Sequence, residues 1–277
     1  MGKLIALLTD FGTSDIYVGV MKGVMKNICP DAEFVDISHH VKRQSIHDGA
    51  LMLRNAYKYF PDGTVFLVVI DPTVGSTRRP ILVKTEKYQF IAPDNGILTP
   101  TLAEIGEYQA VELSNPAYQL TDSSFTFHGR DIFSPAAAYA RRGDVPLGAF
   151  GEAITDLVRL PMPTLSIMDD HIKGEITHID YFGNIITNIG TLQWQDDVTL
   201  ELTTPDANLT LDATTAHLHI KDVHLQAIKH AYHEVAVGDL LLQVDSNGYL
   251  EIGINQGSAS ERLQVSIHDT ITLHLKS

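Results

Sequence analysis

The stretch TVFLVVI at residues 64–70, followed directly by Asp71, decides the fold class of this chain. Seven β-branched or apolar residues in a row, without polar alternation, are typical of a strand that is buried on both faces of a sheet. Such sheets are covered by helices and bind ligands at the carboxyl ends of their strands. The stretch therefore predicts an α/β domain with Asp71 at a ligand-binding edge.

Strand-like and helix-like segments alternate on either side of this stretch, which favours a mainly parallel sheet. Ile16, Val20, Val24 and Ile28 recur every four residues and predict a helix with an apolar stripe. Asp10 directly follows a short apolar run, as Asp71 does, and is a second candidate at the strand ends. The other expected elements are strands at 3–8, 33–37, 81–85 and 88–92, and helices at 46–57, from about 100, and at 136–141.

The pattern changes near residue 160, where LPMPTLS (160–166) carries two prolines and no helical period. We predict an α/β domain over 1–160, a linker over 161–168 and an antiparallel β-barrel domain over 169–277. The turn sequence Asp245-Ser246-Asn247-Gly248 separates two of the later strands. The strands expected in this part are 173–179, 184–189, 198–202, 240–244, 249–254, 263–267 and 270–275.

The composition of the chain argues against several kinds of partner and site. The net charge of −14 over 277 residues argues against a nucleic-acid-binding protein, which needs clustered Lys and Arg. A single cysteine, Cys29, excludes an intrachain disulfide and any zinc site built on two cysteines. The sequence contains neither a signal-peptide pattern nor an apolar run of about 18 residues. We therefore expect a cytoplasmic protein without a membrane partner.

Several polar residues interrupt the apolar segments, and each has a purely structural explanation. Asp10 and Asp131 are good N-cap residues for the helices that follow them, and Asp71-Pro72 is ordinary turn chemistry. His128 is explained equally well as a satisfied buried histidine. No single one of these clusters predicts a function.

A metal-dependent hydrolase is a second interpretation, because carboxylates and imidazoles ligate several divalent metals. The spacing fits no known zinc-binding helix motif, however, and adjacent His39 and His40 would point to opposite faces of a strand. We therefore predict no metal. Phosphate-binding loops of the P-loop or dinucleotide type are also absent. The residues that this alternative would use are Asp10, His39, His40, Asp71, His128 and Asp131.

Five motifs follow one another along almost the whole chain: LLTDFGTSDIYVGVMKG (7–23), VVIDPTVGSTRRPI (68–81), FHGRDIFSPAAA (127–138), IDYFGNIITNI (179–189) and DSNGYLEIGINQGSA (245–259). Five ordered motifs are far more specific than any one alone. Taken together and in this order, they resemble the S-adenosylmethionine (SAM) hydroxide adenosyltransferases, which are SAM hydrolases related to the SAM-dependent fluorinating and chlorinating enzymes.

The resemblance implies an N-terminal α/β domain, a C-terminal β-barrel domain and hydrolysis of SAM to adenosine and methionine by water attacking C5′. It also implies a homotrimer in which each ligand lies between the N-terminal domain of one subunit and the C-terminal domain of the next. SAM is then the substrate, and no cofactor is expected.

The resemblance also assigns residues. The catalytic Asp, Arg and His of the family correspond to Asp71, Arg78 and His128. Arg78 is chosen because it has the family spacing from the aspartate. Arg79 beside it is interpreted as a solvated basic residue. Asp10 corresponds to the ribose-binding aspartate. The remaining substrate contacts that it implies are Asp180 for the methionine ammonium, Asn184, Asn255 and Gln256 for adenine, Ser246 for the methionine carboxylate, Tyr232 for an adenine face, and Phe182 beside Asn184.

The same residues bear on the choice of nucleophile. The halogenating relatives carry Tyr in place of Asp71, and the fluorinating enzyme carries Ser in place of His128. A carboxylate would repel a halide ion, so Asp71 and His128 favour water. One departure concerns substrate binding: the halogenases have Arg after the serine, where this chain has Asn247. A SAM-dependent halogenase and a non-catalytic SAM- or adenosine-binding protein are the alternatives.

Overall fold

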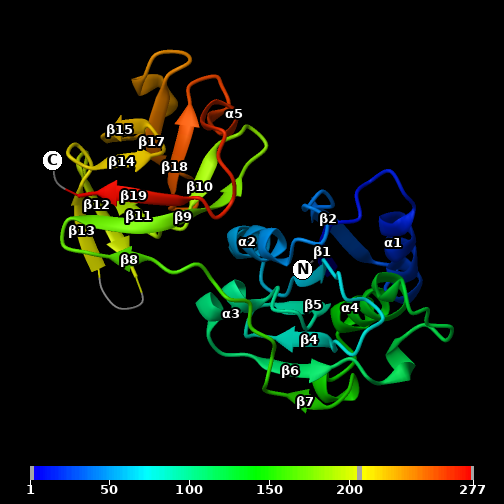
Figure 1. The fold of residues 1–277 in the computed structure, drawn as a ribbon. Helices are drawn as coiled ribbons and strands as arrows, with labels where there is room; N and C mark the ends of the chain where they lie inside the picture. Colours follow the sequence, from blue (N-terminus) through cyan, green and yellow to red (C-terminus); the bar gives the residue numbers. More distant parts are fainter. Residues whose placement is uncertain (1–2, 205–207, 276–277) are drawn as a thin grey trace. The chain divides into compact units, whose positions relative to one another are not determined.

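The computed structural model describes residues 3–204 and 208–275 and divides into two compact units, with the boundary between Pro161 and Met162 (Figure 1). Unit 1 is an α/β unit and unit 2 is built mainly from strands. Ser166–Ile167, inside the segment predicted as a linker, forms a short strand, β8, that pairs with β9 (His171–Ile179). None of the described helices is long and apolar enough to cross a membrane.

Unit 1 contains one seven-stranded sheet in the order β2-β1-β3-β5-β4-β6-β7. The four strands β2, β1, β3 and β5 run parallel, whereas β4, β6 and β7 are added antiparallel. The sheet is therefore mixed, and the prediction of a mainly parallel sheet applies to its first four strands. The strands are β1 Lys3–Thr9, β2 Ala32–Ser38, β3 Val65–Val69, β4 Pro80–Lys84, β5 Gln89–Pro93, β6 Gln109–Glu112 and β7 Ala153–Ile154.

Helices cover both faces of this sheet, as the TVFLVVI stretch predicts. Val65 and Leu67 of β3 pack in the core beneath α1 and α4, while Phe66 and Val68 pack in the core beneath α2 and α3. All five residues of β3 are buried. The helices are α1 Tyr17–Ile28, α2 Ile46–Ala56, α3 Thr99–Ile105 and α4 Ser134–Arg142, with short helical turns at Tyr57–Tyr59, Pro116–Tyr118, Gly129–Phe133 and Leu147–Ala149.

Helix α1 is present as predicted, but it buries a different face. Val18, Met21 and Met25 are its buried residues, whereas Ile16 lies before the helix and is 75% exposed. Residues four apart advance by about 40° around a helix at each step, so a strict four-residue repeat turns away from the core. Alternating steps of three and four keep Val18, Met21 and Met25 on one face.

Unit 2 consists of two sheets. The larger has the order β15-β14-β19-β9-β10-β18-β17-β16 with β8 beside β9, and it is nearly closed and barrel-like; β11, β12 and β13 form the second. The pairings are antiparallel except for β16–β17. The remaining strands are β10 Ile185–Thr187, β11 Leu192–Trp194, β12 Thr199–Thr203, β13 Asn208–Asp212, β14 His217–Ile220, β15 Val223–Gln226, β16 Ile228–Lys229, β17 Leu240–Val244, β18 Leu250–Ile254 and β19 Thr270–His274.

One predicted strand of unit 2 is wrong. The segment 263–267 is not a strand; it begins at the last residue of helix α5 (Ala259–Leu263). The Ser258 side chain accepts a hydrogen bond from the Glu261 N–H and so caps the start of this helix. The helix ends at Gln264, whose φ of 48° is left-handed and incompatible with an extended strand.

Candidate active site

Asp10 and Asp71 follow two neighbouring strands at the same edge of the sheet of unit 1. Strands β1 and β3 are parallel, and their pairing places Thr9 opposite Val69. The side-chain amide of Asn95 donates to the Ile70 carbonyl over 2.9 Å and so fixes the end of β3 just before Asp71. Both carboxylates thus stand at the ligand-binding edge that parallel strands provide.

Asp71, Arg78 and His128, which lie on three separate segments, form one connected group. Arg78 Nε donates to Asp71 Oδ2 over 2.9 Å, and Arg78 Nη2 donates to the same oxygen over 2.5 Å. Arg78 Nη2 also lies 2.7 Å from Nδ1 of His128. The side chains of Arg78 and Asp71 are only 7% and 4% exposed, so the ion pair is well shielded from solvent.

The protonation of His128 follows from this contact. A guanidinium has only donors, so Nδ1 of His128 must accept and the ring proton must sit on Nε2. Burial, followed by repulsion from the Arg78 charge, lowers the pKa of His128 below its usual value. His128 is therefore a neutral imidazole at physiological pH, with Nε2 as a donor.

The Arg78 guanidinium has a further donor that the group does not use. Among the described residues, its Nη1 has no hydrogen-bond partner although the atom is buried. The Cζ atom lies 5.1 Å from the centre of the Phe133 ring, which holds the cation by a cation–π contact. A buried cationic donor of this kind is suited to an anionic or developing negative oxygen.

Two local backbone features position the group. Gly75 has a φ of +78°, and a Cβ there would lie 2.4 Å from the Phe125 carbonyl, so the loop from Asp71 to Arg78 requires glycine at this point. His128 directly precedes a π-helical turn, Gly129–Phe133, that leads into α4. Such turns are frequent at functional sites.

Asp10 and Asp131 do not cap helices, so the structural explanations for both are wrong. Asp10 Oδ2 accepts the backbone N–H of Gln44 over 2.7 Å, while α1 has no side-chain cap at its start. Asp131 is fully buried, pairs with Arg130 over 2.6 Å and accepts the Ser124 N–H. Asp131 therefore fixes the segment before His128.

Arg79 belongs to a different network from Arg78. Arg79 Nη2 donates to Asp94 over 2.6 Å, and its Nη1 donates to Asp156 over 2.8 Å. It is thus not a solvated basic residue but an anchor between two acidic side chains. Arg78 alone of the adjacent pair contacts Asp71 and His128.

Of the six residues of the metal-hydrolase interpretation, Asp71 and His128 both contact Arg78, and the other four make contacts elsewhere. His39 lies between Thr9, at 2.8 Å, and Asp36, at 3.1 Å, while His40 lies 3.3 Å from Thr13. Within the described ranges, no three of the six residues bring ligand atoms close enough to share an ion. The nitrogen and oxygen atoms that could ligate a metal instead contact other protein groups.

In unit 2, Asp180 organises the turn between β9 and β10. Its Oδ1 accepts the backbone N–H groups of Phe182 and Asn184, and its Oδ2 accepts the Asn184 side-chain amide over 2.9 Å. Gly183 has a φ of 83°, and a Cβ there would collide with Ser258. Phe182 is 72% exposed and the neighbouring Tyr181 is 98% exposed, so the turn presents two aromatic rings to solvent.

Tyr232 and Asn184 both lie close to Gly253 and therefore close to each other. A Cβ on Gly253 would come within 2.8 Å of the Tyr232 ring and 3.3 Å of Asn184 Oδ1. The Tyr232 hydroxyl donates to Glu251 over 2.7 Å, and burial raises the pKa of Glu251. The tyrosine ring is thereby held in a fixed orientation.

The other predicted contacts lie at two ends of the β17–β18 hairpin. Asn255 follows β18 and donates its side-chain amide to the Val235 carbonyl, and Gln256 beside it has a left-handed φ of 61°. Ser246 is exposed in the turn at the other end. The intervening strand is about 16 Å long, so Ser246 lies far from Asn255 within one chain.

Sequence reasoning missed several supporting residues: Asn95, Phe133, Glu251 and the backbone of Gln44. Asn95 lies in an Asp-Asn-Gly turn directly after β5, which is a readable signal. Phe133 and Glu251 have no such signal, because their roles depend on what lies opposite them in the fold.

Comparison with protein families settles the relationship. The model of the SAM hydroxide adenosyltransferase N-terminal domain matches residues 5–151, and that of the C-terminal domain matches residues 174–272. The chain belongs to the SAM hydroxide adenosyltransferase family. The family resemblance predicted from the five motifs is therefore confirmed.

Curated relatives of this family member include two kinds of enzyme. Two are named (R)-S-adenosyl-L-methionine hydrolase: one from Methanocaldococcus jannaschii, 34% identical over 98% of this chain and 95% of its own length, and one from Salinispora tropica, 33% identical over 96% of both. A fluorinase from an Actinoplanes species is 27% identical over 98% of this chain and 97% of its own length.

Among solved structures, this family member is similar to an uncharacterized conserved protein from Thermotoga maritima. The two chains share 35% sequence identity with a TM-score of 0.84, and the match covers 97% of this chain and 99% of the other. Both units described above therefore occur together in a chain of nearly the same extent.

Proposed function

We propose that this protein hydrolyses S-adenosyl-L-methionine to adenosine and L-methionine by attack of water at C5′ of the ribose. The observation that carries the proposal is the contact group of Asp71, Arg78 and His128, in which a buried guanidinium keeps one donor without a partner among the described residues. Relatives named SAM hydrolase, 33% and 34% identical over nearly the whole chain, support it.

The chemistry of SAM explains why Asp71, Arg78 and His128 are enough for catalysis without a further acid to protonate the leaving group. The sulfonium of SAM leaves as the neutral thioether of methionine, so the leaving group needs no proton. SAM and water give adenosine, methionine and one proton. The barrier lies in the nucleophile, because water with a pKa of about 15.7 supplies almost no hydroxide at neutral pH.

In the proposed mechanism, Arg78 stabilises the oxygen of the attacking water as negative charge develops on it. His128 donates from Nε2 and orients the water, since its Nδ1 already accepts from Arg78. Asp71 is then the group with lone pairs to accept the proton. Negative oxygen and positive sulfur neutralise each other during attack, which a dry site favours.

The other residues are proposed to bind the rest of the substrate. Asp10 accepts hydrogen bonds from the ribose hydroxyls at the sheet edge that it shares with Asp71. Asp180 carries a negative charge that suits the methionine ammonium. The further proposed contacts, taken from the family resemblance, are Phe182, Asn184, Tyr232, Ser246, Asn255 and Gln256.

SAM-dependent halogenation is the second candidate, because a fluorinase is among the relatives. The Asp71 carboxylate speaks against it, because a carboxylate would repel a halide ion but can accept a proton from an attacking water. A non-catalytic SAM-binding protein has no use for so precise a group.

The test is turnover of SAM in water enriched in ¹⁸O. Attack at C5′ places the label in the 5′-hydroxyl of adenosine, with equimolar unlabelled methionine, and mass spectrometry reads both products. Because the relatives are named for the (R) epimer, the (R) and (S) sulfonium epimers are assayed separately.

Three outcomes contradict the proposal. Formation of 5′-halo-5′-deoxyadenosine in chloride or fluoride supports the halogenase. Release of adenine places the cleavage at the glycosidic bond instead of C5′. Binding of SAM without any product supports a non-catalytic binding protein.

A further inference from the structure

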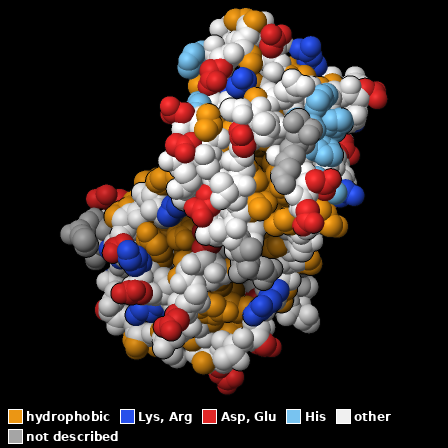
Figure 2. All heavy atoms as spheres, turned by 90° about the vertical axis from the view of Figure 1, so that its left-hand side faces the viewer, with side chains coloured by type: hydrophobic (Ala, Val, Ile, Leu, Met, Phe, Trp, Pro, Cys, Tyr) orange, Lys and Arg blue, Asp and Glu red, His pale blue; other side chains and the backbone are white. Residues whose placement is uncertain are grey.

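Histidine side chains gather on one surface of unit 2. Figure 2 shows them in pale blue, next to one another near the upper right of that view. They come from four strands, β9, β14, β15 and β19, that span about 100 residues of the sequence, and their rings lie 4.3–5.8 Å from those of their neighbours. The five residues are His171 of β9, His217 and His219 of β14, His224 of β15, and His274 of β19.

Strand register brings these residues together. The antiparallel pairing of β14 with β19 places His217 directly opposite His274, and the pairing of β19 with β9 places His274 opposite His171. His219 pairs with His224 across β14 and β15. Three histidines thus form one row across the sheet, and two form the row beside it.

All of these side chains stand on the outer face of the sheet. Leu218, between the two histidines of β14, and Leu273, next to His274, are fully buried in the core of unit 2. Because successive residues of a strand point to opposite faces, the histidines point outward. No packing demand of the core explains imidazoles at these positions.

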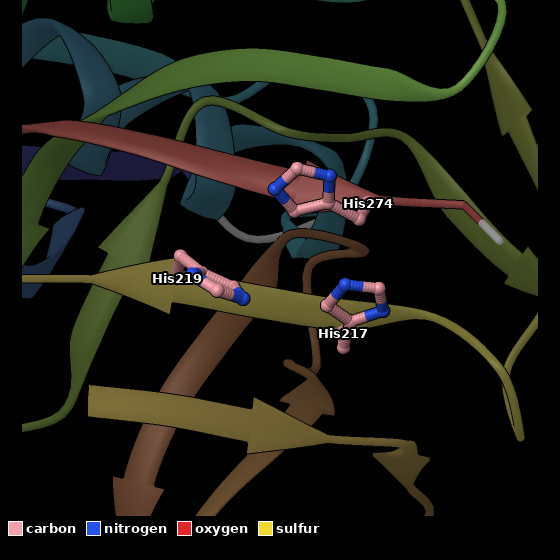
Figure 3. Close-up of side chains that lie close together, drawn as sticks. All are labelled: His217, His219 and His274. Atoms are coloured by element: carbon pink, nitrogen blue, oxygen red, sulfur yellow. The ribbon is translucent and has the colours of Figure 1, made fainter. Parts of the chain in front are cut away.

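Three of the rings lie close enough together to become ligands of one ion. His217, His219 and His274 each offer one nitrogen, and these three nitrogens lie within 4.8 Å of one another (Figure 3). Nitrogens bound to one zinc ion at about 2.0–2.1 Å lie about 3.3 Å apart. Small side-chain rotations at a surface are sufficient to close that difference.

A hydrogen bond fixes which nitrogen of His217 is available to a metal ion. Nδ1 of His217 lies 3.3 Å from the Thr215 carbonyl and donates to it, which leaves Nε2 as the free lone pair. A metal-ligating histidine commonly donates its other nitrogen to a carbonyl in this way.

We propose that His217, His219 and His274 bind one divalent transition-metal ion, with Zn²⁺ as the best match to three neutral imidazoles. Water completes the coordination, and the ion joins β19, the last described strand, to β14. The site belongs to the outer face of the barrel-like sheet and is independent of the proposed SAM hydrolysis. We predicted no metal from the sequence after considering Asp10, His39, His40, Asp71, His128 and Asp131, and the proposed site uses none of these residues.

The experiment is a calorimetric titration of Zn²⁺ into the full chain, prepared without an oligohistidine tag and freed of metal with a chelator. We expect one ion per chain with a dissociation constant in the micromolar range or below. The paired substitution His217→Gln with His274→Gln should weaken binding at least 100-fold. Zn²⁺ should also raise the melting temperature of the unaltered protein but not of the paired variant.

His233→Gln is the matched control, because His233 is an exposed histidine of unit 2 outside this cluster. It should bind Zn²⁺ as the unaltered chain does. Equal melting temperatures of all variants without metal establish that the substitutions preserve the fold. The proposal is overturned if the unaltered chain binds no Zn²⁺ at about 1 mM, or if the paired variant retains the affinity.

Discussion

At the scale of single residues, Arg78 is the centre of the candidate active site, since it contacts both Asp71 and His128. We predict that Arg78→Lys lowers kcat for SAM hydrolysis by about 100- to 1,000-fold, the usual effect of removing one preorganised donor. Lysine keeps the charge but cannot hold a carboxylate and an imidazole with one planar group. Steady-state kinetics of adenosine formation measure the loss.

Arg79→Lys is the control for this prediction, because Arg79 contacts Asp94 and Asp156 instead. It should lower the melting temperature while kcat stays within a few-fold of the original value. A large loss of kcat in Arg79→Lys with little change in Arg78→Lys would show that the two adjacent arginines have been assigned the wrong way round.

At the scale of elements, the buried face of α1 is the clearest difference between sequence pattern and structure. Met21 is fully buried, whereas Ile16 is 75% exposed. We predict that Met21→Ala lowers the free energy of unfolding by about 2–5 kcal/mol, since it leaves a cavity in the core. Ile16→Ala should change it by less than about 0.5 kcal/mol.

Urea denaturation followed by helical circular dichroism measures both variants, because α1 to α4 all belong to unit 1. The tryptophan signal is unsuitable, since Trp194 lies in unit 2. Equal destabilisation by the two substitutions, or a greater effect of Ile16→Ala, would contradict the burial pattern.

How much could be predicted from sequence differs between the two units for a physical reason. The uninterrupted run of β3 and the alternation of strand-like and helix-like segments beside it are local signals, and they predicted the helices α1 to α4 and the strands β1 to β5 of unit 1. Strands β14 and β15 are only four residues long and half exposed, so their alternation is too short to stand out. They were missed, and the histidine cluster on them was missed with them.

In the candidate active site, too, residues with a local sequence signal could be predicted, whereas contacts that depend on tertiary packing could not. Asp10 and Asp71 were located by their position after apolar strands, which depends only on local sequence. The contact of Arg78 with His128, 50 residues later, depends on the packing of a loop against a π-helical turn. Without the family resemblance, the sequence offered no means of pairing these two residues.

At the scale of the whole molecule, the family resemblance implies a trimer in which unit 1 of one subunit and unit 2 of the next share each ligand. We predict that Asp71→Asn chains and Asp180→Ala chains, each inactive alone, recover activity when unfolded and refolded together in equal amounts. Each mixed trimer then contains one site with both units intact. Since three quarters of random trimers are mixed, about a quarter of all sites should be active.

The recovered rate separates the two possible arrangements of the site. If one chain supplied both units, every site in the mixture would carry one of the two substitutions, and no activity would return. The mixed species is isolated by placing a different purification tag on each of the two chains, and light scattering measures its mass. Recovery of about a quarter of the activity in the whole mixture, or about a third in the isolated mixed trimers, therefore requires sites shared between neighbouring subunits, and an inactive mixed trimer excludes them.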